Sequence, residues 1–351
     1  MDAIWNFLWS IISFYNFLLI RIVIVLVSML LTAAYLVYFE RKIAAWAQNR
    51  RGPNRVGWYG ALQSFADVFK LLFKEDIVPD AANKKIHTLA PIIALFVAFT
   101  TYAVLPIGPE ITIAGYKIPL VIADVNIGIL YVLALTSLSV YGITFAGWSS
   151  GSKYSLLGGI RSSAQMISYE ISMGFSIGGV VLLAESLRPI AIVGSQSGFM
   201  WNVFVQPIGF ITFLVSAFAE TNRLPFDLPE AEPELVGGYH TEYSSMKFAA
   251  FFLAEYANML IASIMIATLY LGGWQIPYIE TWGLSAGLVI VLQILGFFIK
   301  IGALLFFFIW VRWSIPRFRY DQLMNLGWKV MFPLSLINII WVAVLIMIFK
   351  I

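Results

Sequence analysis

The sequence predicts an all-α integral membrane protein, and three observations lead to this fold class. Sixty per cent of the 351 residues are hydrophobic and 12% are charged, whereas a soluble domain has about half apolar and about a quarter charged residues. The mean hydropathy is +0.86. Long apolar stretches recur along the whole chain, and no linker, internal repeat or low-complexity tract divides it. Residues 1–351 are therefore expected to form a single polytopic membrane domain that needs lipid as its solvent.

Eight segments are long enough to cross a membrane, which requires about 20 mostly apolar residues for a hydrocarbon core of about 30 Å. The expected spans are residues 14–38, 87–107, 121–147, 162–185, 199–219, 248–272, 285–311 and 330–349. An even number of spans places both termini on one side. Asp2 is the only charged residue before Arg21, so the N-terminus lacks the basic start of a signal peptide and is expected to remain as structure.

The positive charges predict the orientation of these spans. The first, third, fifth and seventh connections hold 17 of the 22 Lys and Arg residues, whereas the opposite connections and the C-terminal tail hold only Lys117, Arg188 and Lys350. The side that keeps positive charge is the cytoplasmic side, or the matrix side in a mitochondrion. Both termini should then face the periplasm of a bacterial inner membrane, the favoured location, or the intermembrane space.

The first inner connection, residues 40–86, predicts an amphipathic helix. It begins with the basic segment ERKIAAWAQNRRGPNRVGWYG and continues as GALQSFADVFKLLFK. In the second segment, apolar and polar side chains alternate at helical spacing: Leu62, Phe65, Phe69 and Leu72 oppose Gln63, Asp67, Lys70 and Lys74. This pattern is typical of a helix in the membrane interface. The arginines before it, Arg50, Arg51 and Arg55, lie beside a span and indicate topology anchors or partner contacts, with no nucleic acid bound.

The other long inner connection, residues 220–247, is acidic and lies within AETNRLPFDLPEAEPELVGGYHTEYSSMKF. Three prolines at four-residue spacing exclude a continuous helix. Only Arg223 and Lys247 oppose the acids of this connection, which include Asp227, Glu230, Glu232, Glu234 and Glu242. The prolines and the interleaved Leu and Val residues favour an ordered, docked segment over a solvated loop.

Three carboxylates lie within or at the end of expected spans. Glu170 lies about eight residues from the inner end of its span, or about 12 Å deep. Glu255 lies at a similar depth, and Glu220 ends the fifth span. A charge inside a membrane costs at least a few kcal/mol, so each carboxylate suggests a functional role. Together they suit a proton relay, because burial and mutual repulsion favour protonation near neutral pH. Alternatively, each hydrogen-bonds a neighbouring helix.

One lysine, two glycines and the two histidines are expected to have structural roles. Lys300, in the middle of the seventh span, is interpreted as a counter-ion to one of the glutamates. Gly174 and Gly178 predict close helix packing. His87 and His240 lie in polar connections and are interpreted as loop residues rather than ligands.

The composition excludes several kinds of redox and nucleotide site. The chain has no cysteine, which excludes disulfides, thiolate zinc sites and ligation of an iron–sulfur cluster. Its two histidines lie in polar connections, which excludes a haem pair held between helices. There is neither a glycine-rich dinucleotide turn nor a Walker A loop. We therefore expect no metal, nucleotide or redox cofactor to be bound by this chain alone.

Two long motifs carry a resemblance to a known family. They are ERKxxAWxQxRRGPNRVG, from Glu40 to Gly57, and AETNRxPFDLPEAExELVxGYxTEYS, from Ala219 to Ser244. Over its whole length, the chain resembles the family of the H subunit of proton-pumping NADH:quinone oxidoreductase (respiratory complex I, NDH-1), the counterpart of mitochondrial NADH dehydrogenase subunit 1. The sequences SYE around Glu170 and AEY around Glu255 agree with the same family.

The resemblance implies a place in the enzyme and roles for particular residues. In this family the subunit lies between the membrane arm and the peripheral arm and forms much of the quinone chamber. The implied chamber residues are Glu40, Arg41, Asp67, Glu220, Arg223, Phe226, Asp227, Glu230, Glu232 and Glu234. The implied proton path consists of Glu170, Glu220 and Glu255 and leads towards the antiporter-like subunits. None of these residues is implied to be catalytic.

The resemblance also implies where the redox chemistry occurs. Electrons from NADH would pass through FMN and iron–sulfur clusters on partner subunits to a quinone, either ubiquinone or menaquinone. One alternative is a related membrane subunit of a membrane-bound hydrogenase, a formate hydrogenlyase or a ferredoxin-linked dehydrogenase. Another is a stand-alone cation/proton antiporter, but the two large inner connections suggest that other proteins dock there.

Overall fold

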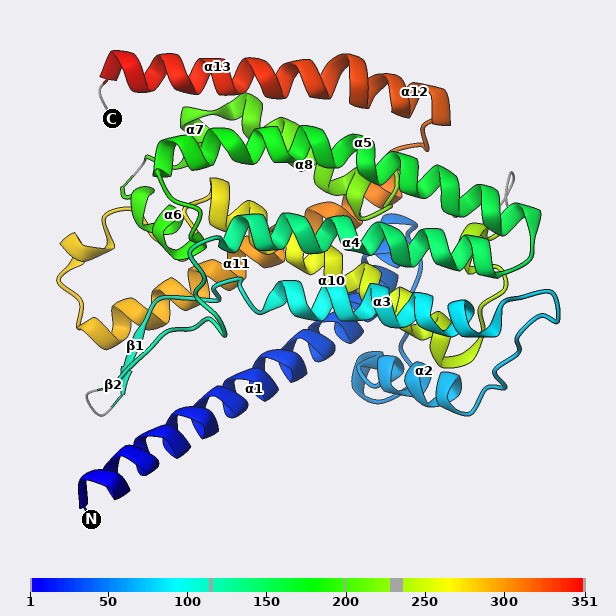
Figure 1. Ribbon diagram of the computed structural model, residues 1–351, viewed down its shortest axis with the longest axis horizontal. Coiled ribbons are helices and arrows are strands. Elements are labelled where there is room, and N and C mark those ends of the chain that lie inside the picture. The colour runs from blue at the N-terminus through cyan, green and yellow to red at the C-terminus, as the bar shows by residue number, and fades with distance from the viewer. Residues whose placement is uncertain (1, 114–115, 199, 228–235, 350–351) are drawn as a thin grey trace.

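The computed structural model describes residues 2–113, 116–198, 200–227 and 236–349, and it is a bundle of long helices (Figure 1). Seven helices of this described part are long and apolar enough to cross a membrane. They are Leu18–Ala47 within α1 (Asp2–Ala47), α3 (Lys84–Tyr102), α4 (Gly128–Ser149), α5 (Lys153–Ala184), α10 (Ser245–Tyr270), α11 (Ala286–Ser314) and Tyr320–Phe349, which contains α12 (Tyr320–Asn325), the π-helical turn Leu326–Met331 and α13 (Phe332–Phe349). The all-α membrane fold class is confirmed.

The fifth expected span, residues 199–219, is a broken helix in the part of it that the structure describes. It consists of α7 (Asn202–Val205) and α8 (Pro207–Glu220), separated at Gln206, whose φ is −134° and ψ is 68°. The 14 residues of α8 extend about 21 Å at about 1.5 Å per residue, less than the roughly 30 Å core. Asn338 of α13 lies at the break, accepting from the Gly209 amide at 3.0 Å and donating to Gln206 at 3.1 Å. A neighbouring helix thus binds the Gly209 amide and the side-chain oxygen of Gln206, whereas the side-chain nitrogen of Gln206 has no partner among the described residues.

The first span is longer than expected at its inner end. Helix α1 continues through Glu40 and Arg41 to Ala47, so these two residues lie on a helix rather than in a loop. The predicted amphipathic helix is present as α2 (Gln63–Leu72). The apolar side chains predicted to face the membrane interface are exposed, namely Leu62, Phe65, Phe69 and Leu72.

The connections lie at two ends of the bundle. The N-terminal end of α1 and the C-terminal end of α13 lie at the left in Figure 1, as do α6 (Pro189–Ser195) and the short antiparallel hairpin of β1 (Ile111–Ile113) and β2 (Tyr116–Ile118). Helix α2 and the turn from α4 to α5 lie at the opposite end. The first and last described helix ends therefore lie at the same end of the bundle.

Glycines allow two close helix contacts. Helices α4 and α5 approach at Gly147 and Gly159, where a Cβ on Gly159 would lie 3.1 Å from the Gly147 Cα. The prediction of close packing at Gly174 is wrong, since nothing lies within 4 Å of its Cβ position, and Gly178 has only an ordinary contact at 3.6 Å. The tight position is Gly179, where a Cβ would lie 2.6 Å from atoms of Gln206 and Asn338 at the helix break.

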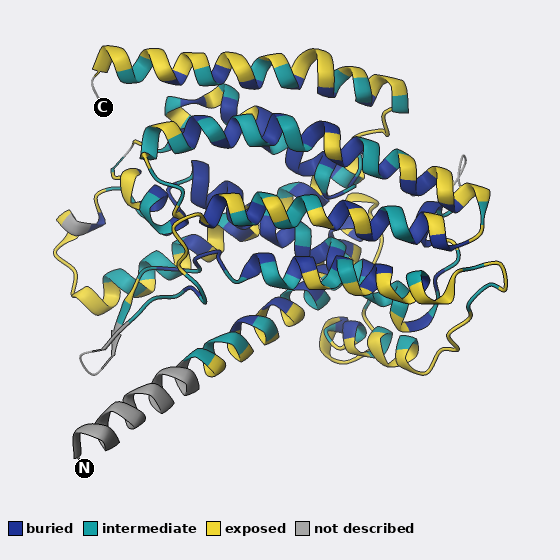
Figure 2. Cartoon of the chain, viewed as in Figure 1, coloured by how far each residue is buried: buried dark blue, intermediate teal, exposed yellow. Residues whose placement is uncertain are grey.

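Helix α10 is the centre of the bundle. Sixty-seven per cent of its apolar stretch is buried, against 17% for α11. Figure 2 shows buried residues gathered in the middle of the bundle and exposed residues along α13 at its edge. Side chains on α10 are therefore placed to contact most of the other elements.

Candidate functional site

A cluster of charged residues joins four parts of the chain. Glu40 comes from α1, Arg223 follows α8, Glu255 and Tyr256 lie on α10, and Arg312 lies on α11. Arg223 Nη1 and the Tyr256 hydroxyl both donate to Glu40 Oε2, each at 2.7 Å. Arg312 Nη1 donates to the other oxygen of Glu40. We call these five residues the paired cluster.

Arg223 is the centre of the paired cluster. Its Nε lies 2.6 Å from Glu255 Oε1, an ion pair without the alignment of a hydrogen bond. Its guanidinium also lies 4.3 Å from the centre of the Tyr256 ring, and its side chain is only 2% exposed. Burial alone would lower the pKa of Arg223, but the carboxylates of Glu255 and Glu40 raise it well above its usual range. The two arginines and two glutamates balance in charge.

The other two membrane carboxylates have only hydroxyl partners. Glu170 on α5 accepts a hydrogen bond from Ser137 of α4. Glu220, at the end of α8, lies within hydrogen-bonding reach of Thr136 and close enough to Glu170 for their charges to repel each other. Neither carboxylate forms an ion pair with any residue that the structure describes. We call Glu170 and Glu220 the unpaired acids.

Two small cavities lie on either side of Glu220. The first is surrounded by α4, α5, α8 and α10 and reaches Thr136. The second reaches Glu255 of the paired cluster. Of the three predicted relay carboxylates, Glu220 lines both cavities, Glu255 lines the second, and Glu170 lines neither.

Arg41 and Asp67, predicted to lie at a ligand chamber, form a separate surface pair. Arg41 Nη1 donates to Asp67 Oδ2 at 2.6 Å, and the side chains are 47% and 30% exposed. Gln63 donates to the other Asp67 oxygen at 2.9 Å. The pair fastens α2 to the inner end of α1.

The start of the acidic connection is docked against the bundle. Phe226 is buried and stacks on Phe318 with ring centres 5.6 Å apart, and its carbonyl accepts from Gln165 of α5 at 2.8 Å. Asp227 is also buried and accepts from Arg317 at 3.4 Å. The remaining predicted residues, Glu230, Glu232 and Glu234, lie outside the described residues.

Sequence reasoning did not single out several residues that complete these groups. They are Tyr256 and Arg312 in the paired cluster, Thr136 and Ser137 beside the unpaired acids, and Gln165 beneath the acidic connection. Arg312 offered a signal, because an arginine in the last turn of a very apolar helix needs a partner. The hydroxyls and the amide carry no such signal.

Lys300 is not a counter-ion to a glutamate, and that prediction is wrong. Its ammonium donates to three carbonyls just beyond the end of α10, those of Leu271 at 2.7 Å, Gly273 at 2.8 Å and Gln275 at 2.9 Å. It also lies 4.3 Å from the centre of the Trp201 ring. All three N–H donors are used, so Lys300 caps the C-terminal end of the central helix, where a cation is favourable.

Both histidines are packed against aromatic rings. His87 stacks on Tyr243 with ring centres 4.0 Å apart, and His240 lies 5.4 Å from Phe251. Both are buried, so they are core residues rather than ordinary loop residues. Burial raises the pKa of Tyr243 to about 12. Within the described residues, no three His, Asp or Glu side chains are grouped to hold a metal ion.

The fold and these charges define a polytopic membrane protein with ionisable side chains inside its helix bundle. The family model described as NADH dehydrogenase matches residues 20–343. "NADH-quinone oxidoreductase subunit 8" of Rhodothermus marinus is 56% identical over 326 residues, 90% of this chain and 93% of the relative. Two relatives named as H subunits of NADH-quinone oxidoreductase are each 52% identical. The one from Cytophaga hutchinsonii aligns over 91% of this chain and 94% of its own, and the one from Geobacter sulfurreducens over 93% and 94%.

These matches extend over nearly the whole of both chains. The chain therefore belongs to the NADH dehydrogenase family that contains the H subunits of NADH-quinone oxidoreductase. The resemblance found in its two inner motifs is confirmed.

Proposed function

We propose that this chain is a membrane subunit of a proton-translocating NADH:quinone oxidoreductase, where it forms much of the quinone chamber and the start of the proton path. The observation that carries the proposal is identity of 52–56% to subunits named for that enzyme, over at least 90% of this chain. The names of these relatives favour this function over a hydrogenase subunit, a ferredoxin-linked dehydrogenase subunit or a free-standing antiporter.

Partner subunits supply the redox groups of such an enzyme. NADH, FMN and iron–sulfur clusters belong to a peripheral arm, and this chain, with no cysteine, meets the substrate quinone, ubiquinone or menaquinone. Its partners are the peripheral-arm subunits of the quinone site and the antiporter-like membrane subunits. The complex lies in a bacterial inner membrane, with both termini of this chain in the periplasm and its long inner connections facing the cytoplasm.

The quinone chamber is built around the inner ends of the helices. Its residues in this chain are Glu40, Arg41, Asp67, Glu220, Arg223, Phe226, Asp227, Glu230, Glu232 and Glu234. Two features of the described residues support this position. The chain from Arg223 to Asp227 is docked against buried partners, and the amphipathic helix α2 exposes an apolar face suited to a hydrophobic quinone tail.

The paired cluster offers a route from quinone chemistry to proton movement. Reducing a quinone to a quinol takes two electrons and two protons, so charge develops in the chamber. Arg223 responds to that charge, and any movement of Arg223 weakens its ion pair with Glu255. Glu255 lines the cavity shared with Glu220, so a proton taken up there passes to Glu220 and then towards Glu170. Such coupling requires an element with two arrangements, and we assign this role to the connection that starts at Arg223.

A deletion and complementation experiment tests the proposal. Membranes lacking this chain should lose NADH:quinone reduction but keep NADH oxidation by ferricyanide, a soluble acceptor that bypasses the membrane arm. Returning the tagged chain should restore quinone reduction, and mass spectrometry and optical spectra of the purified complex should show the flavin and iron–sulfur arm. A tagged chain that purifies alone, or with a nickel–iron protein, would overturn the proposal.

A further inference from the structure

The two cavities beside Glu220 share three lining residues, which we call the shared wall. Each has a volume of about 30 Å³, and about 10–15 Å³ is enough for one water where polar partners are present. Glu255 lines only the second cavity and Thr136 only the first. The residues that line both are Glu220, Thr221 and Asn258. These three residues therefore lie between the cavity that holds Glu255 and the cavity that reaches Thr136.

Thr221 and Asn258 are the neutral polar residues of this wall, and they differ in their hydrogen bonds. The Thr221 hydroxyl is bound to the backbone carbonyls of Ala217 at 3.0 Å and Phe218 at 3.2 Å. The Asn258 amide, in contrast, has no hydrogen bond within the part of the chain that the structure describes. It lies three residues after Glu255 on α10, so the two side chains share one face of the central helix.

Other neutral polar side chains that line the cavities already form hydrogen bonds. The Thr136 hydroxyl of the first cavity donates to the carbonyl of Leu133, and Ser139 and Asn222 of the second cavity are bound to Thr136 and Ser162.

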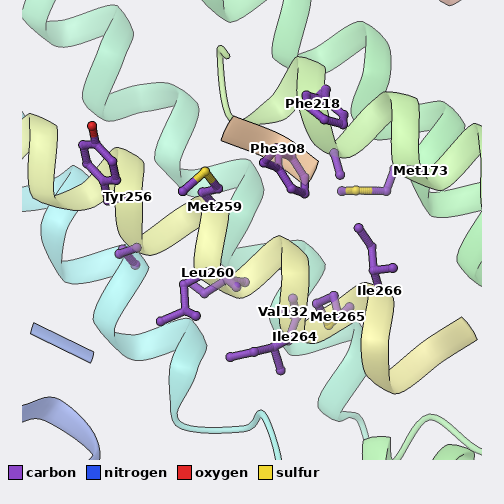
Figure 3. Packing of buried hydrophobic residues seen from close by; sticks show 14 of the residues in the cluster. Val132, Met173, Phe218, Tyr256, Met259, Leu260, Ile264, Met265, Ile266 and Phe308 are labelled. Carbon is purple, nitrogen blue, oxygen red and sulfur yellow. The ribbon is translucent and has the colours of Figure 1, made fainter. Parts of the chain in front are cut away.

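Val132, Met173 and Met265 line the first cavity and belong to the buried apolar cluster that Figure 3 shows between α4, α5 and α10. A side-chain amide both donates and accepts hydrogen bonds, so one amide orders water on two sides without taking a proton itself. Asn258 has this chemistry at the point where the two cavities meet.

We propose that Asn258 is a positioning residue for proton transfer, which orders water in both cavities and thereby connects Glu255 and Glu220, in the second cavity, to the water of the first cavity. This inference rests on the proposed function, because it assigns a step within the same proton path. This role of Asn258 differs from a packing role, because packing depends on the shape of the side chain and not on its amide group. Leucine has nearly the same shape as asparagine and removes the amide.

The test uses the intact complex reconstituted in vesicles, with NADH oxidation and proton uptake measured together in H₂O and D₂O. Asn258→Leu should slow coupled proton uptake at least about tenfold, because positioned proton transfer contributes about 10²- to 10⁴-fold, and should enlarge the solvent isotope effect. Asn258→Gln and Asn258→Ser, which keep a polar group, should recover much of the rate. The matched control is Ser263→Ala, which removes a buried hydroxyl of the same helix that donates to Met259 at 2.9 Å and lines neither cavity.

The outcomes separate this inference from the function on which it rests. Wild-type complex without NADH:quinone activity would overturn the proposed function itself. Active wild-type complex, together with Asn258→Leu complex that pumps at the normal rate with a normal isotope effect, would overturn only the role of Asn258. Should Asn258→Leu fail to assemble, Asn258→Ala and Asn258→Ser decide the matter, since only the serine variant is expected to pump well.

Discussion

Glu40 and Glu220 are both carboxylates inside the same helix bundle, yet their surroundings are opposite. Glu40 accepts hydrogen bonds from two arginines and a tyrosine. Glu220 has a threonine hydroxyl within reach, a neighbouring glutamate and two cavities. A carboxylate fully matched by cations is held in its charged form, whereas one that lacks them is tolerated most easily when it takes up a proton. The comparison separates a group that holds the structure from a group suited to carry protons.

Glu255 links the paired cluster to the surroundings of the unpaired acids. It pairs with Arg223 of the paired cluster and also lines the cavity that reaches Glu220. A change in the position of Arg223 is therefore the simplest way for one region to act on the other.

Removing Arg223 should break the paired cluster. Arg223→Met leaves two buried carboxylates, Glu40 and Glu255, with a single arginine, Arg312, and an uncompensated buried charge costs about 3–5 kcal/mol. We expect little assembled complex on native gels and a clearly lowered melting temperature for what remains. Arg223→Lys keeps a charge but loses the planar guanidinium and should have a smaller effect. Normal assembly and melting of Arg223→Met would show that the cluster does not hold the structure.

Neutralising Glu220 should impair proton transfer and leave assembly of the complex intact. Glu220→Gln removes the proton carrier without leaving an unpaired charge, so the complex should assemble normally while proton uptake in vesicles falls about 10²-fold or more. Glu40→Gln is the matched comparison and should mainly reduce assembly, because Arg223 and Arg312 lose their shared carboxylate. Loss of assembly in Glu220→Gln with normal assembly in Glu40→Gln would reverse the assignment.

The hydroxyl beside Glu170 should matter less than the carboxylates. Ser137→Ala removes the donor to Glu170, and a hydrogen bond to a charged group contributes about 1.5–3 kcal/mol. We expect proton uptake to slow, by less than in Glu220→Gln, with normal assembly. Thr144→Val is a control, since that hydroxyl of the same helix donates to the carbonyl of Val140 at 2.8 Å and lines neither cavity. Equal effects of Ser137→Ala and Thr144→Val would count against a specific role for the Glu170 contact.

The exposed pair of Arg41 and Asp67 should contribute least to stability. A solvent-exposed ion pair is worth about 0–1 kcal/mol, so Arg41→Ala should leave assembly and melting unchanged. If Arg41 lines the quinone chamber, the same variant should still raise the KM for quinone several-fold. An unchanged KM would remove Arg41 from the chamber and leave it as a fastener of α2.

Features that depend on local composition could be predicted from the sequence. The spans follow from apolar runs, α2 follows from the spacing of Leu62, Phe65, Phe69 and Leu72, and the membrane acids stand out because charge is rare there. Features that depend on contacts between distant residues could not be predicted from the sequence. The break at Gln206 depends on Asn338, and the partners of Lys300 are backbone carbonyls that carry no sequence signal.

The most direct test of the account asks which carboxylates change protonation when quinone is reduced. Infrared difference spectra of the intact complex, recorded before and after NADH addition, report this through the band of the protonated carboxyl group. We expect Glu220→Gln to remove part of that signal and Glu40→Gln to leave it unchanged in the complex that assembles. A signal that persists in Glu220→Gln and disappears in Glu40→Gln would contradict the division between the unpaired acids and the paired cluster.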